Sequence, residues 1–139
     1  MSELRTAALE ALDFHAVRRS VADRATYPPA RQLALELAPS YSAEEVEALQ
    51  RETAEGRSLL ETVDLSLHTA ADPSAAVARS ALEGVLTGQE LLEVAESLEV
   101  QRRARSTVLR NRDRAPLLAY IVEGIPELEE LQRQVRHSI

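Results

Sequence analysis

The sequence predicts an all-α fold, a helical bundle of about seven to eight helices. Four strong helix formers dominate its 139 residues: there are 22 Ala, 21 Leu, 18 Glu and 16 Arg. Aromatic residues make up only 3%, whereas β-sheets favour aromatic and β-branched residues. Apolar residues also recur at helical spacing between clear proline and glycine breaks. Together these three observations exclude a mainly β architecture.

Length and composition bound the class of protein further. The length fits a single domain, which we place at residues 1–139. With no cysteine, a disulfide scaffold and a cysteine-based zinc site are both excluded. No apolar run approaches the ~20 residues that a membrane span needs, and residues 1–5 do not resemble a secretory signal. We therefore expect a cytoplasmic protein that does not insert into membranes.

The first two predicted helices are separated by a pair of prolines. Asp13 is positioned to cap a helix that runs through Val17 and Val21, since apolar residues follow at steps of four. Residues 27–29, Tyr-Pro-Pro, end this helix, because the residue before a proline is pushed out of the helical region. A short helix follows and ends at residues 38–39, Ala-Pro.

The third predicted helix is one of two long ones, at about residues 43–62. Ser42 followed by Glu45 predicts a capping box, in which each side chain accepts the other residue's backbone N–H. A stripe of apolar and small residues then recurs at steps of three and four, which is typical of helix-on-helix packing. The stripe consists of Val46, Leu49, Thr53, Gly56, Leu60 and Val63.

The second half of the chain contains the other long helix, at about residues 88–109. Asp72 and Pro73 predict a short helix before it, and Thr87 with Glu90 predicts a capping box at its start. Its apolar face is interrupted from Gln101 onward, so we expect its second half to project into solvent or to meet a polar surface. A helix around residues 117–122 then runs to the next glycine.

The last predicted helix begins at Pro126. Its apolar face runs from Leu128 through Leu131 and Val135 to Ile139, with no capping glycine, so we expect the natural chain to continue and this one to be a fragment. Two narrow apolar faces favour partner helices, and we expect a homodimer. The candidate packing and dimer residues are Val46, Leu49, Thr53, Leu60, Val63, Leu128, Leu131 and Val135.

The charge pattern contains one exceptional segment. Residues 1–100 carry 8 Arg and 18 acidic residues, whereas residues 101–114 carry 6 Arg and one Asp. Arginine forks bind phosphate oxygens well, so this segment is a candidate nucleic-acid surface. Arginines near a helix C-terminus also stabilise the helix dipole, which is the structural alternative. The block consists of Arg102, Arg103, Arg105, Arg110, Arg112 and Arg114.

No motif predicts catalysis by this chain. A phosphate-binding loop needs a lysine, and the sequence has none. The three histidines, His15, His68 and His137, are too scattered for a metal site. The acidic clusters lie in the first halves of predicted helices, where the helix dipole favours negative charge. We therefore expect no catalytic residue, no metal site and no cofactor in this chain.

Several of these segments resemble one known family: the bacterial MutS paralogue that lacks the mismatch-reading domain and usually ends in an Smr nuclease domain. The resemblance is to its N-terminal region and extends over most of residues 9–109. The matching segments are Ala11-Leu12-Asp13-Phe14 with Val17, then Glu36-Leu37-Ala38-Pro39-Ser40, then Glu44-Glu45-Val46 through Glu52-Thr53-Ala54-Glu55, and finally Gly84-Val85-Leu86-Thr87 with Glu90-Leu91-Leu92 and Leu98.

The resemblance implies a role without implying a site. The full-length family has an ATPase domain that binds ATP and Mg, and it dimerises. Members are implicated in DNA repair, in suppressing homologous recombination on branched DNA and in rescuing collided ribosomes. The ATPase and endonuclease motifs lie outside this segment. We therefore expect a non-catalytic domain that supports the core and dimerises. The alternative is a module that binds branched DNA or ribosomal RNA through Arg102–Arg114.

Overall fold

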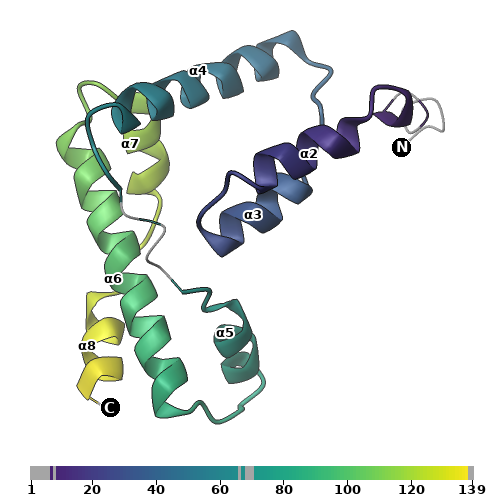
Figure 1. Ribbon diagram of the computed structural model, residues 1–139. Helices are drawn as coiled ribbons and strands as arrows, with labels where there is room; N and C mark the ends of the chain where they lie inside the picture. Colours follow the sequence, from purple (N-terminus) through teal and green to yellow (C-terminus); the bar gives the residue numbers. More distant parts are fainter. Residues whose placement is uncertain (1–6, 8, 66, 68–70, 138–139) are drawn as a thin grey trace. The chain divides into compact units, whose positions relative to one another are not determined.

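The computed structural model describes residues 7, 9–65, 67 and 71–137, and every regular element in this part is helical. This confirms the predicted all-α class. Figure 1 shows the order of the helices along the chain. Their bounds are α2 Phe14–Ala22, α3 Pro28–Leu35, α4 Ala43–Leu60, α5 Ser74–Ala81, α6 Gly88–Arg110, α7 Pro116–Glu123 and α8 Glu129–His137.

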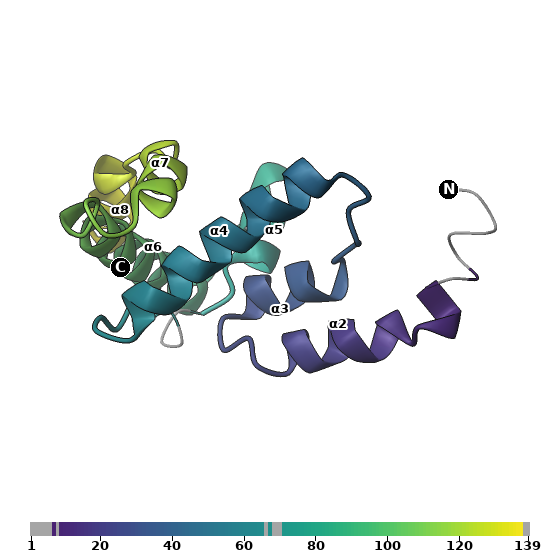
Figure 2. The same cartoon turned by 90° about the horizontal axis from the view of Figure 1, so that it is seen from above.

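The chain forms two compact units, Met1–Pro39 and Ser40–Ile139. In the first unit α2 and α3 pack side by side (Figure 2). Each helix buries one alanine, Ala22 in α2 and Ala34 in α3, and small side chains allow helices to approach closely. The prediction that residues 1–139 act as one domain stays a prediction.

The N-terminal end of α2 differs from the predicted cap. Asp13 occupies the N-cap position, but its φ is 48° and its side chain makes no capping hydrogen bond. A side-chain cap uses an extended backbone, so this left-handed conformation explains the missing bond. The helix also ends at Ala22, short of the predicted stop at residues 27–29.

The two predicted capping boxes have different outcomes. At α6 the box is complete: the Glu90 N–H donates to the Thr87 hydroxyl at 3.3 Å, and the Thr87 N–H donates to the Glu90 carboxylate at 2.9 Å. At α4 only half forms. The Ser42 hydroxyl accepts the Glu45 N–H at 3.3 Å, but the Glu45 carboxylate accepts the Ser40 hydroxyl instead.

The second unit is organised around α6, which contacts α5, α7 and α8, while α4 contacts α7. Its core contains Leu59 of α4, Val108 of α6 and Ala115 just before α7. Partly buried apolar residues surround this core: Val63, Leu65, Leu118 and Val122. Both long helices are confirmed, within two residues of each predicted end.

Two predictions for the second unit are wrong. The second half of α6 does not project into solvent or meet only polar groups, because Ala104 and Val108 are buried there and α6 packs against α7. Val108 belongs to the apolar core there, against which Leu118 and Val122 of α7 pack. The last helix begins at Glu129, three residues after Pro126. Ile139, with which its apolar face was predicted to end, lies outside the described residues.

Candidate functional site

One short helix, α7, is anchored at its N-terminus by a carboxylate from α4. The Glu55 side chain accepts the backbone N–H groups of Leu117 at 2.8 Å and Leu118 at 3.2 Å. These amides belong to the first turn of α7 and have no partner within the helix. The carboxylate also faces the positive end of the helix dipole. Glu55 therefore acts as an N-cap from a residue 62 positions earlier in the chain.

The C-terminus of the same helix is bound by arginines of the predicted basic block. Arg105 donates from Nε to the Val122 carbonyl at 3.1 Å and from Nη1 to Glu127 at 2.5 Å. Arg112 pairs with Glu123, the last residue of α7, also at 2.5 Å. Cations at this end complement the helix dipole. Arg105 and Arg112 therefore help to hold α7 in place.

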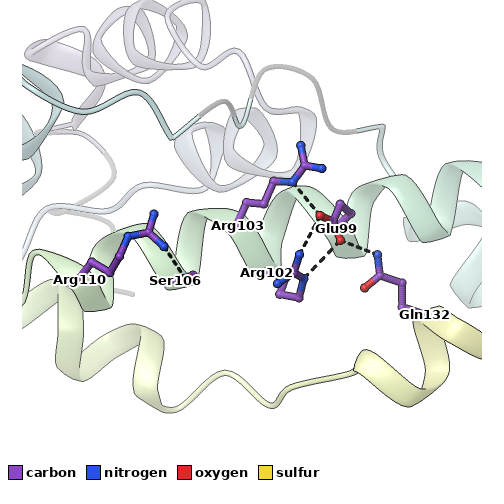
Figure 3. Close-up of polar contacts among 6 residues, drawn as sticks. All are labelled: Glu99, Arg102, Arg103, Ser106, Arg110 and Gln132. Carbon is purple, nitrogen blue, oxygen red and sulfur yellow. Dashed lines mark hydrogen bonds and ion pairs between the residues drawn. The ribbon is translucent and has the colours of Figure 1, made fainter.

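Glu99 in the middle of α6 connects two further arginines with α8 (Figure 3). Its carboxylate accepts from Arg102 Nη2 at 2.9 Å, from Arg103 Nε at 2.7 Å and from the amide of Gln132 at 2.8 Å. The hydrogen bond from Arg102, followed by that from Gln132, lowers the pKa of Glu99 to about 2. Gln132 is the buried residue of α8, so this bond helps to fix α8 on α6.

The remaining two arginines of the block bind hydroxyl groups. Arg110 donates to the Ser106 and Thr107 hydroxyls at 2.9 Å each, and Arg114 donates to the Thr62 hydroxyl at 2.9 Å. The structure thus divides the six candidate nucleic-acid residues into two groups. Among the described residues, Arg102, Arg103, Arg105 and Arg112 pair with carboxylates, and Arg110 and Arg114 do not.

The candidate packing residues of α4 also fall into two groups. Leu49 and Leu60 have 51% and 59% of their surface exposed, and Val46 is partly buried. Thr53 is exposed, and its hydroxyl donates to the Leu49 carbonyl at 2.8 Å. In contrast, Val63 packs against the core next to Leu59, a residue that the predicted stripe missed.

The candidate residues of α8 are less buried than a core helix requires. Leu128, just before α8, and Leu131 within it are each 44% exposed, and Val135 is partly buried. The helix also contacts α6 through a polar group, since the buried Gln132 amide donates to Glu99 at 2.8 Å. Of the apolar residues that were predicted to meet partner helices, Leu49 and Leu60 are thus more than half exposed, and Leu128 and Leu131 are nearly so.

Within residues 7, 9–65, 67 and 71–137, no group of three or more His, Asp or Glu side chains could hold a metal ion. No helix in the same part of the chain combines the length and apolarity of a membrane span. A Cβ at Gly56 of the stripe would lie 3.9 Å from the Leu118 side chain of α7, which is ordinary van der Waals contact. His68 lies outside these residues.

The chain is similar in sequence to several curated proteins, all named endonuclease MutS2. The protein from Thermus thermophilus is 35% identical over 136 residues, and the one from Shouchella clausii is 30% identical over 133 residues. The protein from Pelotomaculum thermopropionicum is 28% identical over 133 residues. These matches cover 92–95% of this chain and 16–17% of each relative.

Two further comparisons find nothing: no family model matches the chain, and no solved structure matches it significantly. The chain spans about a sixth of the length of the relatives it matches. The resemblance that the sequence motifs predict is nevertheless confirmed, because four curated relatives of one kind match nearly the whole chain. The chain is thus similar, over nearly its whole length, to one segment of the proteins named endonuclease MutS2.

Proposed function

We propose that the chain serves as a non-catalytic helical module that supports and dimerises a MutS-like protein. One observation carries this proposal: α4 exposes Leu49 and Leu60 while it contacts α7 through Glu55 and its neighbours. One face of α4 therefore packs within the unit, whereas the face that carries Leu49 and Leu60 is exposed. A second copy of the chain would bury the exposed leucines in a twofold interface.

The free energy that a dimer gains by burying Leu49 and Leu60 follows from the exposed fractions of these two side chains. Burying a leucine fully contributes about 1.5–3 kcal/mol, so the exposed halves of Leu49 and Leu60 contribute about 1 kcal/mol each. Four such leucines in a twofold dimer contribute about 4 kcal/mol, which at most offsets the lower end of the ~4–15 kcal/mol that association costs in lost translational and rotational freedom. A dimer at micromolar concentration therefore also requires other apolar residues, and Leu128 and Leu131 are the candidates.

Light scattering on matched variants tests this proposal. We expect Leu49→Glu and Leu60→Glu each to shift the chain toward the monomer, because a charge would have to be desolvated in the interface. Leu82→Glu is the control, since Leu82 is 85% exposed in the turn after α5 and belongs to no predicted interface. Circular dichroism establishes that each variant remains helical. Equal effects of all three substitutions would contradict the proposal.

We further propose that the chemistry of the full-length protein lies outside this chain. The support is the similarity to proteins named endonuclease MutS2, of which this chain covers only 16–17%. ATP and Mg would bind to the part of the full-length protein outside this chain. Branched DNA or the ribosome would also bind there, as the substrate of a cytoplasmic protein that suppresses recombination. The purified chain should neither hydrolyse ATP nor cleave DNA. ATP hydrolysis or DNA cleavage by an activity that co-purifies with the chain would contradict this assignment.

Nucleic-acid contact through Arg102–Arg114 remains the second candidate function. It is supported by Arg103, whose side chain is 71% exposed, and by Arg110 and Arg114, which have no carboxylate partner among the described residues. Binding would then neutralise about two or three phosphates. The logarithm of the affinity should fall against the logarithm of salt concentration with a slope of about −2 to −3. A slope near zero would refute phosphate contact.

A further inference from the structure

A polar pocket lies along α6, in the second unit of the chain. It has a volume of about 400 Å³ and is formed by the middle of α6 together with residues 64–65. Two of its eight lining residues are apolar, Leu65 and Val100. The others carry charge or a hydroxyl group: Asp64, Arg102, Arg103, Ser106, Thr107 and Arg110.

The spacing along α6 places two arginines over the same face. Arg103 and Arg110 are seven residues apart, which is two turns and about 10 Å of helix. Ser106 and Thr107 lie one turn from each of them. Figure 3 shows the Arg103 and Arg110 side chains on the same side of the helix, whereas Arg102 lies on the side of Gln132. Two guanidinium groups thus flank two hydroxyl groups.

These two arginines retain hydrogen-bond donors for a ligand. Arg102 uses both Nε and Nη2 on Glu99, whereas Arg103 donates to Glu99 through Nε, and its Nη groups have no partner among the described residues. Arg110 is oriented by the Ser106 and Thr107 hydroxyls, each at 2.9 Å, and by no carboxylate among the described residues. Three arginines therefore line the pocket against one aspartate, Asp64.

From this arrangement we propose that the pocket binds a phosphate group, with Arg103 and Arg110 as its two cationic ligands and the Ser106 and Thr107 hydroxyls as additional donors. Guanidinium groups match the oxygens of phosphate in geometry and charge. The same chemistry is offered by free phosphate or pyrophosphate and by a polynucleotide backbone. The second source rests on the nucleic-acid candidate function, whereas the first does not, and neither requires the dimer.

A titration of the 139-residue chain with inorganic phosphate, pyrophosphate and a DNA oligonucleotide tests the site. Nitrogen-detected NMR of arginine side chains at constant ionic strength should show saturable shifts for Arg103 and Arg110. Loss of one charge-assisted contact should weaken binding about tenfold, so Arg103→Gln and Arg110→Gln should each raise the dissociation constant by that factor. Arg133→Gln is the matched control, because Arg133 is 74% exposed and also pairs with a carboxylate on its own helix.

A second variant changes affinity in the opposite direction. Glu99→Gln removes the negative charge that holds Arg103, while an amide can still bond Gln132, and we expect phosphate to bind several-fold more tightly. Saturable shifts with pyrophosphate and none with the oligonucleotide would support the site with a free ligand and refute the nucleic-acid function. Tighter, salt-dependent binding of the oligonucleotide would support both. Absence of saturable shifts, or an equal loss in Arg133→Gln, would overturn the proposal.

Discussion

Replacement of Glu55 by alanine should destabilise the second unit, because it removes the cap of α7. The carboxylate accepts two N–H groups, those of Leu117 and Leu118. Loss of a side-chain cap costs about 0.5–2 kcal/mol, and a hydrogen bond to a charged group contributes about 1.5–3 kcal/mol. We therefore expect the free energy of unfolding to fall by about 2 kcal/mol. For a unit of ~100 residues this lowers Tm by about 10 °C.

Urea and thermal unfolding, followed by circular dichroism, measure this loss. Glu47→Ala is the control, because Glu47 is an exposed residue of the same helix and its contact with Arg51 is made by its backbone carbonyl, which alanine retains. Glu55→Gln separates the contribution of the hydrogen bonds from that of the charge. An amide oxygen still accepts the two hydrogen bonds, but it lacks the negative charge, whose interaction with the helix dipole contributes about 0.3–1 kcal/mol. If Glu55→Ala costs no more than Glu47→Ala, the cap contributes nothing and the reasoning fails.

Two further predictions concern the contacts of α6. The pKa of Glu99 is lowered from 4.5 to about 2, so the stability that this carboxylate contributes is present above pH 4.5 and is lost as the pH falls toward 2. The difference in unfolding free energy between the chain and its Glu99→Gln variant should therefore change with pH, and a pH-independent difference would contradict this prediction. Arg105→Gln should cost about 1–3 kcal/mol, because it removes the charged partner of the Val122 carbonyl and of Glu127; Arg103→Gln, at a 71% exposed side chain, should cost less than 1 kcal/mol in the same assay.

Local signals in the sequence predict the helices well. The bounds of α4 and α6 and the box of Thr87 with Glu90 were recoverable because capping and apolar spacing act over a few residues. Where a cap depends on competing neighbours, prediction fails. Ser40 takes the Glu45 carboxylate away from Ser42, and no spacing rule anticipates that exchange.

Contacts between distant segments could not be predicted. Glu55 lies within a segment that supports the family resemblance, yet its role depends on α7, 62 residues later. The buried leucine of α4 is Leu59 and not its neighbour Leu60, because the side of the helix that faces α7 carries Glu55, Gly56 and Leu59. Likewise, the basic block appears free in the sequence, but Arg105 and Arg112 pair with carboxylates beyond it.

Equilibrium sedimentation of the unmodified chain tests the claim that this helical module self-associates. The mass of one chain is 15.3 kDa. We predict that the measured mass rises toward twice this value across the micromolar range and that the Leu49→Glu and Leu60→Glu double variant stays at the monomer mass. A monomer at every concentration, from a chain whose helices are intact by circular dichroism, would contradict the claim.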